Sequence, residues 1–534
     1  MLSTIPPAKL HGLALLAPLA RCLLAVAATV ALPVGSAVPA SAAAQEHRHY
    51  KLIDVGTFGG PESYVHETVP LITATREINL QEMVGGSATP IPITATSSPS
   101  VCGGLSGLFS GLVPFVDHAF ALREGTVTDL GALPGATNCS VANAINSNGV
   151  IVGQSESGEI DPLLGFNQSH AVQWKDGHIE DLGTLGGYES NAASLNNRGM
   201  VVGSATNAVP DPSACFGFGT QCRAVLWRNG VIQDLGTLGG PDSLASLINE
   251  RGQVAGMANT NTSPSAVCFP FSSLTTDPFL WENGRMTDLG TLGGTCGLPL
   301  ALNNRGQVVG ISNLPGDAVT HPFLWPGADG RMQDLGTLGG DFGNPNAINE
   351  AGEVVGYSNT TNGGPVIAFL WKKGVMTNLG TLDGDCASTA QAVNAKGQIV
   401  GYSSTNCDPF SFSAGRRAVL WEDGSMVDLN ALIPPGSGMQ LNLAEAINDR
   451  GEIAVNGTPS GCNLLEACGH AVLLIPCDEN HQDIEGCDYS PVEARTVAPG
   501  RATGTQKRST PQEISRTRTL TMKRQPGFMP RMMH

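Results

Sequence analysis

Charged residues are scarce in this chain: they make up 14% of its 534 residues, which include 67 glycines. That balance favours many short strands joined by turns over a helical protein. Basic residues are also outnumbered, 29 against 46 acidic ones. The negative charge lies in residues 45–487, with eighteen Lys or Arg against forty-three Asp or Glu. Such an acidic body argues against a nucleic acid as the partner.

No uninterrupted apolar run reaches the roughly 20 residues that a membrane-spanning helix needs. The run at residues 22–32 is too short for a membrane anchor. Lys9 and Arg21 precede it and Ala40-Ser41-Ala42 follows it, so residues 1–44 are typical of a cleavable secretory signal. We expect cleavage near residues 42–44 and a secreted product, extracellular or periplasmic, with no transmembrane segment.

The phrase Asp-Leu-Gly-Thr-Leu-Gly-Gly recurs through the chain. Full copies begin at Asp181, Asp234, Asp288 and Asp334, and looser copies begin at Asp54, Asp129, Asn378 and Asp428. From Asp129 onward the spacing is 44 to 54 residues, after one longer step of 75. This period is typical of the four-stranded blades of a β-propeller.

Each repeat contains signals for four strands. A small-residue strand ends in Asn and meets an Asn-x-x-Gly turn, as at Asn303 to Gly306. A Val-rich second strand, a variable loop and a third strand follow, and Asn-Gly or Asp-Gly then turns the chain into the fourth strand. We call the side with these short turns the turn face. The loop face holds the two-to-three loops and the connections between blades, where nearly all the length variation falls.

All six tryptophans occupy one position, the end of the third strand. They are Trp174, Trp227, Trp281, Trp325, Trp371 and Trp421. A ligand-stacking ladder is one interpretation, but equivalent positions in successive blades favour packing between blades. We predict that they are core residues.

The two ends of the array complement each other. Residues 51–56 read as a fourth strand alone, and residues 470–474 read as a third strand with no fourth behind it. Pairing them would close a ring, so we predict an all-β fold: a single β-propeller of eight four-stranded blades, closed by the N-terminal strand. The first repeat, 73–131, is degenerate and lacks its Trp. The propeller would span residues 45–487, and the basic segment 488–534 would be a disordered tail.

Twelve cysteines remain once Cys22 is removed with the signal, and no paired CxxC pattern points to zinc. Disulfides are expected in an oxidising compartment, although the sequence alone leaves their connectivity open. The pairs we predict are Cys102–Cys139, Cys215–Cys222, Cys268–Cys296, Cys386–Cys407, Cys462–Cys468 and Cys477–Cys487.

Several two-to-three loops carry Phe-x-Phe, which makes their aromatic residues weak candidates for ligand binding. They are Phe216, Phe218, Phe269, Phe271, Phe410 and Phe412. Exposed, these residues would form an aromatic rim suited to a glycan or a peptide. Buried, they would be small cores that hold long loops together, and the sequence favours this second interpretation.

The repeat resembles the HAF family of extracellular repeat proteins, which takes its name from the tripeptide that opens the third strand. The tripeptide is intact at His118-Ala119-Phe120 and relaxed at His170, His321 and His470. The resemblance covers about residues 50–475 and implies a bacterial exported protein. It supplies no established activity and no functional residues to transfer.

The sequence contains no HExxH, GxSxG, P-loop or full EF-hand motif. Asp383-Gly384-Asp385 is a weak calcium hint that fits a variant of the repeat's own turn better. We therefore predict no catalytic residues, no metal site and no cofactor, and we lean against an enzyme. We expect a monomeric binding scaffold for an extracellular glycan or protein. The alternative is a carbohydrate-active enzyme, a hydrolase or lyase, with its site in the propeller funnel.

Overall fold

Nearly all regular structure among the described residues is β-strand. The computed structural model describes residues 44–65, 78–79, 82–94, 97, 115–135, 137–211, 219–265, 268, 274–327, 330–407, 415–463, 465–482 and 484–497. These residues belong to one compact unit that begins at Ala42. No helix within them is long and apolar enough to cross a membrane. The predicted signal, apart from Ala44, lies outside the described residues.

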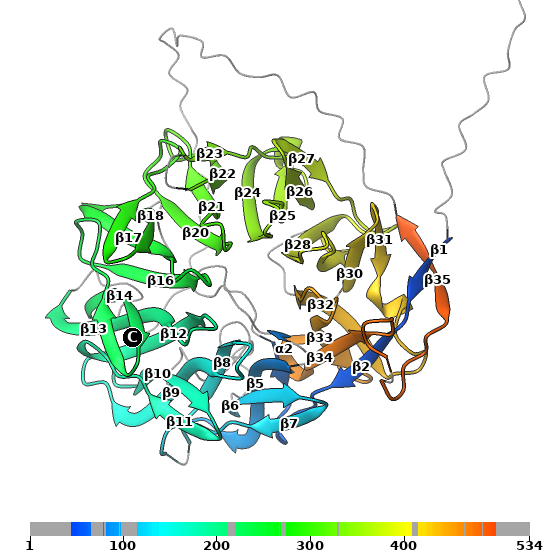
Figure 1. The fold of residues 1–534 in the computed structure, drawn as a ribbon, viewed down its shortest axis with the longest axis horizontal. Coiled ribbons are helices and arrows are strands. Elements are labelled where there is room, and N and C mark those ends of the chain that lie inside the picture. Colours follow the sequence, from blue (N-terminus) through cyan, green and yellow to red (C-terminus); the bar gives the residue numbers. More distant parts are fainter. Residues whose placement is uncertain are drawn as a thin grey trace, which may run out of the picture. The chain divides into compact units, whose positions relative to one another are not determined.

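The sheets are antiparallel meanders of four strands that follow one another around a ring (Figure 1). The fold is therefore a β-propeller, and each meander is a blade. The first blades are β3 (Ser63–Tyr64), β5 (Glu82–Pro92), β6 (Phe115–Arg123) and β7 (Thr126–Asp129); β8 (Ser140–Ile145), β9 (Ile151–Ile160), β10 (Asn167–Lys175) and β11 (His178–Asp181); β12 (Gly186–Leu195), β13 (Val201–Pro210), β14 (Thr220–Arg228) and β15 (Val231–Asp234); and β16 (Ser243–Ile248), β17 (Val254–Pro264), β18 (Leu274–Glu282) and β19 (Arg285–Asp288).

The later blades continue the same order. They are β20 (Gly297–Leu302), β21 (Val308–Asn313), β22 (Thr320–Trp325) and β23 (Gln333–Asp334); β24 (Gly339–Ile348), β25 (Val354–Thr360), β26 (Val366–Lys372) and β27 (Val375–Asn378); β28 (Ala387–Val393), β29 (Ile399–Ser404), β30 (Arg416–Glu422) and β31 (Ser425–Asp428); and β32 (Met439–Ile447), β33 (Ile453–Pro459) and β34 (His470–Pro476), completed by β2 (Tyr50–Asp54). A short β4 (Ile78–Asn79) pairs with β5.

One parallel bridge, between Thr320 and Phe342, joins the blade that starts at β20 to the blade that starts at β24, so their strands form a single sheet. The strand pairing therefore supports four-stranded blades without fixing their number, and the count of eight stays a prediction from the repeat.

A repeated glycine in the second strand is required by a bulge in the first. The register shifts between Ala142 and Ala144 in β8, and a Cβ on Gly153 of β9 would lie 2.0 Å from the carbonyl oxygen of Val141. No side chain fits there, so glycine allows the close approach. The same clash would occur at Gly203, Gly256, Gly310, Gly356 and Gly401.

The tryptophans are core residues, as predicted: each is at most 7% exposed. Trp227 also donates its indole N–H to the carbonyl oxygen of Leu182 in the preceding linker, at 2.8 Å. Leu122 and Leu474 take the equivalent position in the two blades that lack a tryptophan, and both are fully buried. The tryptophan row therefore packs blades together and does not form a ligand ladder.

Buried asparagines at the start of the Asn-x-x-Gly turns link successive blades on the turn face. Asn196 Oδ1 accepts from the backbone N–H groups of Arg198 and Met200, and its Nδ2 donates to the carbonyl oxygen of Asn249 in the next blade. The same interblade bond recurs from Asn146, Asn249, Asn303, Asn349 and Asn394. We call this series the asparagine belt.

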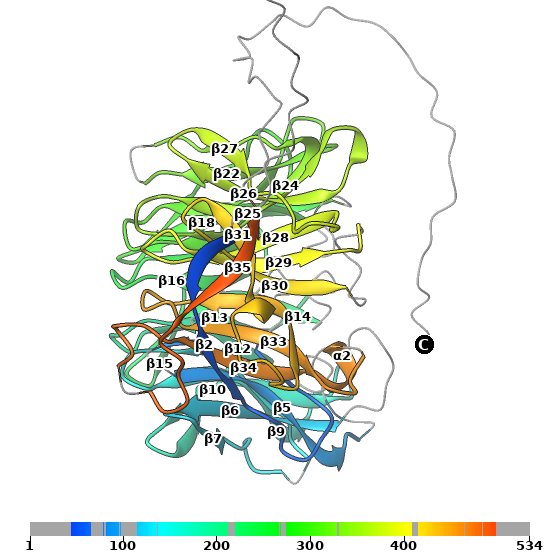
Figure 2. The same cartoon turned by 90° about the vertical axis from the view of Figure 1, so that its right-hand side faces the viewer.

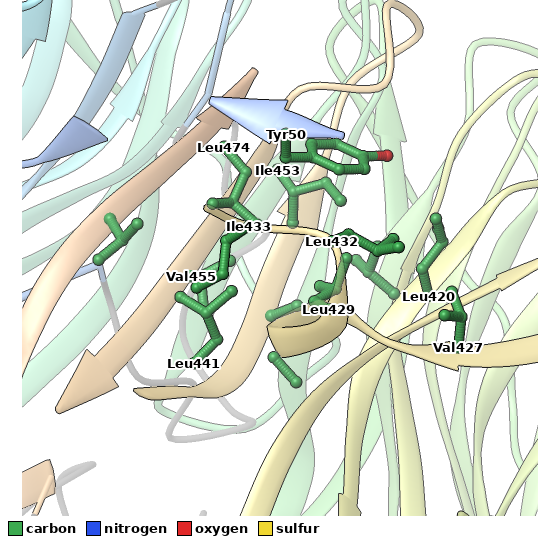
Figure 3. Packing of buried hydrophobic residues seen from close by; sticks show 14 of the residues in the cluster. Tyr50, Leu420, Val427, Leu429, Leu432, Ile433, Leu441, Ile453, Val455 and Leu474 are labelled. Atoms are coloured by element: carbon green, nitrogen blue, oxygen red, sulfur yellow. The ribbon is translucent and has the colours of Figure 1, made fainter. Parts of the chain in front are cut away.

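The N-terminal strand closes the ring. β2 pairs antiparallel with β34, from Tyr50 opposite Pro476 to Asp54 opposite Val472. His470 Nδ1 lies 2.9 Å from Asp54 Oδ1, in the arrangement that His118 and Asp129 have within one blade. Tyr50 is buried in the core cluster at this seam (Figure 3). The predicted closure is therefore confirmed by the strand pairing.

One predicted boundary is wrong. We expected a disordered tail from residue 488, but β35 (Pro491–Val497) pairs with β31 and with β1 (Ala44–Arg48), which extends that blade to six strands. β35 alternates buried Ala494 and Thr496 with exposed Glu493 and Arg495, a period-two pattern that the basic composition of the tail obscured. Figure 2 shows β35 (orange) beside the N-terminal strands (blue) across the blade edges. Residues 498–534 lie outside the described part of the chain.

Candidate functional site

The loop face is cross-linked by disulfides within the described residues. Cys268–Cys296, Cys386–Cys407 and Cys462–Cys468 each tie loop-face connections together. A fourth bridge, Cys477–Cys487, closes the segment between β34 and β35. These four pairs are the ones expected from the repeat, and they restrain the connections where the repeat varies most.

The predicted Cys215–Cys222 pair is wrong. Cys222 is a free thiol, 1% exposed, in a cluster with Leu244, Met257 and Leu298. It lies on β14 between two blades, where its side chain packs against apolar neighbours. Cys215 lies outside the described residues.

Two other sets of predicted residues lie partly or wholly outside the described residues. Cys139 forms a disulfide, but Cys102 lies outside the described residues, so that pairing stays a prediction. All the candidate phenylalanines also fall outside the described ranges: Phe216, Phe218, Phe269, Phe271, Phe410 and Phe412. Their role in ligand binding stays untested.

Four consecutive blades carry hairpins that are longer than the others. Their second strands, β5, β9, β13 and β17, have 10 or 11 residues, whereas β21, β25, β29 and β33 have six or seven. Each long hairpin has a register shift near its end on the loop face. We call these four extensions, formed with β6, β10, β14 and β18, the hairpin wall.

Large apolar side chains are exposed along the hairpin wall. Ile91, Ile160, Leu163, Phe166 and Val209 are 36–55% exposed and come from three neighbouring hairpins. Exposed apolar side chains that gather on one face typically mark an interaction surface. These extensions were not predicted from the sequence, because the motif that marks the third strand begins at His170, three residues after β10 begins at Asn167.

The tip between β9 and β10 is held in one conformation. Asp161 Oδ1 accepts from the backbone N–H of Leu163 at 2.6 Å, and the Asp161 N–H donates to the carbonyl oxygen of Phe166 at 2.7 Å. Leu163 Cδ1 lies 3.3 Å from where a Cβ on Gly219 would be, so the tip leans on the next hairpin. The apolar groups are thus presented by a preformed turn, which lowers the entropic cost of binding.

A hollow of about 550 Å³ lies on the loop face at the blade of β32, β33 and β34. The linker from β31 to β32 lines one side, including Pro434 and Ser437, and the end of β33 lines the other, including Thr458 and Ser460. Its volume is within the usual range for small-molecule sites. We call it the linker hollow.

The loop-side ends of the third and fourth strands carry repeated His–Asp pairs. His170 Nδ1 lies 2.7 Å from Asp181 Oδ2, and Asp181 Oδ1 accepts from the Gly183 N–H. Burial alone would raise the pKa of Asp181, but its bonds to His170 and Gly183 outweigh burial and lower that pKa. The pKa values of Asp54, Asp129 and Asp334 are lowered in the same way. These pairs fasten strands within a blade.

Two other carboxyl groups have a raised pKa. Burial, reinforced by the charges of Asp161 and Glu156, raises the pKa of Glu189 to about 8, although a bond from the Ser169 N–H opposes the shift. Burial and the neighbouring Asp288 raise the pKa of Asp277 to about 7. Shifted carboxyl groups can mark catalytic sites, but Asp277 stands at the position of the pairing histidine and Glu189 binds backbone of the neighbouring strand.

The innermost strands present amide side chains that bond from blade to blade. Asn346 Nδ2 donates to Gln391 Oε1 at 2.6 Å, and Gln391 Nε2 donates to Glu445 Oε2 at 3.5 Å. Asn346, Gln391 and Glu445 lie on β24, β28 and β32, the first strands of three successive blades (Figure 1). Among the described residues, no group of three His, Cys, Asp or Glu side chains could hold a metal ion.

No protein-family model matches this chain, and no curated protein matches it. Among solved structures, the beta-propeller domain of the Trilobed protease from Pyrococcus furiosus is 10% identical, covering 54% of this chain and 82% of that one, with a TM-score of 0.32. TolB from Acinetobacter baumannii is 9% identical over 62% and 78%, with a TM-score of 0.28. Trypanosoma rangeli sialidase is 10% identical over 73% and 58%, with a TM-score of 0.31. At such low values, the assignment to the β-propellers rests on the strand pairing described above.

Proposed function

We propose that this chain is a secreted binding scaffold of the HAF-repeat type, which takes an extracellular glycan or protein on its loop face. The hairpin wall is the observation that carries the proposal. It presents exposed apolar side chains at the ends of long hairpins, and at the β9–β10 tip these side chains are held in place by Asp161.

The rest of the molecule supports a rigid platform for such a surface. The asparagine belt fastens the blades on the turn face, and three disulfides restrain connections on the loop face. A scaffold of this kind positions variable loops without moving itself. Four disulfides among the described residues fit the expected oxidising compartment.

A screen of purified protein on arrays of glycans and of cell-envelope proteins tests the proposal, with product formation assayed for every hit. We expect saturable binding without turnover. The double variant Leu163→Ser/Phe166→Ser should weaken that binding at least tenfold, about 1.4 kcal/mol. Val231→Ser is the matched control, because Val231 is 65% exposed on the turn face.

Two outcomes contradict the proposal. Catalytic turnover of a bound glycan would establish the alternative, a carbohydrate-active enzyme. Equal binding by the tip variant and the control would remove the hairpin wall from the binding surface.

A further inference from the structure

The linker hollow forms where the sequence departs from its repeat. Elsewhere the segment after the fourth strand reads Leu-Gly-Thr-Leu-Gly-Gly or a close variant, but after β31 it reads Leu-Asn-Ala-Leu-Ile-Pro-Pro-Gly-Ser-Gly. The facing connection, after β33, also departs from the repeat, because it carries the Cys462–Cys468 bridge and the short α2 (Leu465–Cys468). Both walls of the hollow are therefore specific to this blade.

The walls of the hollow are preformed. Asn430 Nδ2 donates to the carbonyl oxygen of Leu441 at 2.9 Å, and Asn430 Oδ1 accepts from the Leu441 N–H at 2.7 Å. Leu432 and Ile433 are buried in the core cluster beside Tyr50 (Figure 3). Across the hollow, the Ser460 N–H donates to the carbonyl oxygen of Gly438 at 2.7 Å. A ligand would meet a shape that is already in place, which favours binding.

None of the described residues that line the hollow has a side chain that ionises. The lining combines the apolar surfaces of Pro434, Pro435 and Met439 with the amide of Gln440 and the hydroxyl of Ser437. The Thr458 and Ser460 hydroxyls donate to Asn442 Oδ1 and to the Gly438 carbonyl oxygen, and so keep their lone pairs as acceptors.

The net negative charge of residues 45–487 disfavours an anionic ligand. These residues carry far more Asp and Glu than Lys and Arg, and the described residues that line the hollow include no Lys or Arg to attract an acidic ligand. Neutral hydroxyl and amide groups beside apolar ring surfaces match a ligand that has both hydroxyls and C–H faces.

We infer that the linker hollow binds an uncharged saccharide. The inference rests on the proposed binding function and names the ligand class for one part of the loop face. The neutral lining, the preformed walls and the local departure from the repeat are the observations that carry it. A neutral peptide is the competing occupant that the experiment must distinguish.

Saturation-transfer NMR and calorimetry on the full secreted chain test the inference. The probes are neutral hexose, pentose and N-acetylhexosamine oligomers, the corresponding uronate and sulfated oligomers, and uncharged peptides. Ser437→Trp fills the hollow from an exposed position, and Gln440→Ala removes its amide. Val231→Trp places the same bulk on the turn face, and the unfolding midpoint of each variant confirms its fold.

We expect a neutral saccharide to bind the natural chain and the control equally, and Ser437→Trp to weaken that binding at least tenfold, about 1.4 kcal/mol. The inference is overturned if neutral saccharides do not bind, if acidic ones or peptides bind as tightly, or if Ser437→Trp changes nothing. If Ser437→Trp leaves saccharide binding unchanged but Leu163→Ser/Phe166→Ser still abolishes binding of another ligand, the proposed binding scaffold holds without the linker hollow as a subsite.

Discussion

Single buried asparagines connect the repeat sequence to the ring, because each one satisfies its own turn and also reaches the next blade. Asn196 is fully buried and makes three bonds to backbone groups, one of them to Asn249 of the following blade. Alanine at this position would leave two N–H groups and one carbonyl without these partners.

We therefore expect Asn196→Ala to lower the free energy of unfolding by about 1–3 kcal/mol, measured by denaturant unfolding. Asn148→Ala is the matched control, since Asn148 is exposed and donates one bond to the Asn197 carbonyl oxygen. Equal losses in the two variants would show that the asparagine belt does not stabilise the ring.

A second pair of positions couples neighbouring blades. The Ala171 N–H donates to Ser190 Oγ, but the equivalent Pro278 has no N–H, and Gly297 stands where the serine would be. A Cβ on Gly297 would lie 2.8 Å from Pro278 Cδ. The two residues are therefore matched to each other.

A double-mutant cycle tests this coupling. Gly297→Ser alone should destabilise by about 1–3 kcal/mol through the clash, and Pro278→Ala alone should leave an unpaired N–H. Together they should restore the bond seen in other blades, giving a coupling energy of at least about 1 kcal/mol in denaturant unfolding. Additive changes in the free energy of unfolding would show that Gly297 and Pro278 are not coupled.

The raised pKa of Asp277 gives a pH dependence of defined sign. In the folded chain the Asp277 carboxyl keeps its proton up to about pH 7. This group therefore lowers the free energy of unfolding as the pH rises from the ordinary pKa of an aspartate to about 7. Asp277→Asn should raise stability at pH 8 by about 1 kcal/mol, with the gain shrinking toward pH 4.

Asp181→Asn is the opposite control. Because the pKa of Asp181 is lowered in the folded chain, this group stabilises the fold at pH values above the ordinary pKa of an aspartate. That stabilisation is lost as the pH falls below the ordinary pKa. The variant should therefore be less stable at pH 8. Shifts of the same sign in urea unfolding midpoints would contradict the assignment of these two groups.

At the scale of single residues, the sequence was sufficient to predict the features that recur in the repeat. The tryptophans, the turn asparagines and four disulfide pairs were accessible because each recurs, or follows from the loop map. Cys222 was not, because its neighbours Leu244 and Leu298 come from other blades. The linker hollow was also missed, since a departure from a repeat does not reveal the space it encloses.

At the scale of elements, β1 and β35 form a latch along the outer edge of the blade next to the seam. Arg48 Nη1 donates to Asp478 Oδ2 at 2.9 Å, and His481, with its side chain fully buried, lies between Asp478 and Glu452. Both Asp478 and His481 lie inside the Cys477–Cys487 loop. That bridge therefore closes the segment whose Asp478 binds Arg48 of β1 and which leads into β35.

Cys477→Ser/Cys487→Ser should destabilise the latch by about 2–3 kcal/mol and lower hydrogen-exchange protection in β1 and β35. Cys462→Ser/Cys468→Ser, which removes a bridge away from the latch, should leave that protection unchanged. Retained protection of β1 and β35 in the first variant would show that the bridge has no part in the latch.

Strand existence was well predicted from the sequence, but strand length was not. The recurring phrase and the turn motifs marked most blades, whereas the extra residues of β9 and β13 are not part of the repeat. β35 was missed because its alternation lies within a basic segment. The length of a hairpin and the placement of an added strand such as β35 depend on neighbouring strands, and local sequence patterns do not show these.

At the scale of the whole propeller, the described blades form a closed ring with a fastened turn face and a variable loop face. Closure matters for binding because an open seam would let neighbouring blades separate and disturb the loop positions. Complementary half-blades at the two ends of the repeat were sufficient to predict it. Which ligand the loop face takes depends on surface chemistry that the repeat does not encode.

The most direct test of this account is a cross-link across the seam. Lys51 lies opposite Ile475 in the pairing of β2 with β34, so Lys51→Cys/Ile475→Cys should form an intramolecular disulfide, read by non-reducing peptide mapping, and raise the unfolding midpoint. Failure to form this cross-link, or its formation only between molecules, would contradict a ring closed by the N-terminal strand.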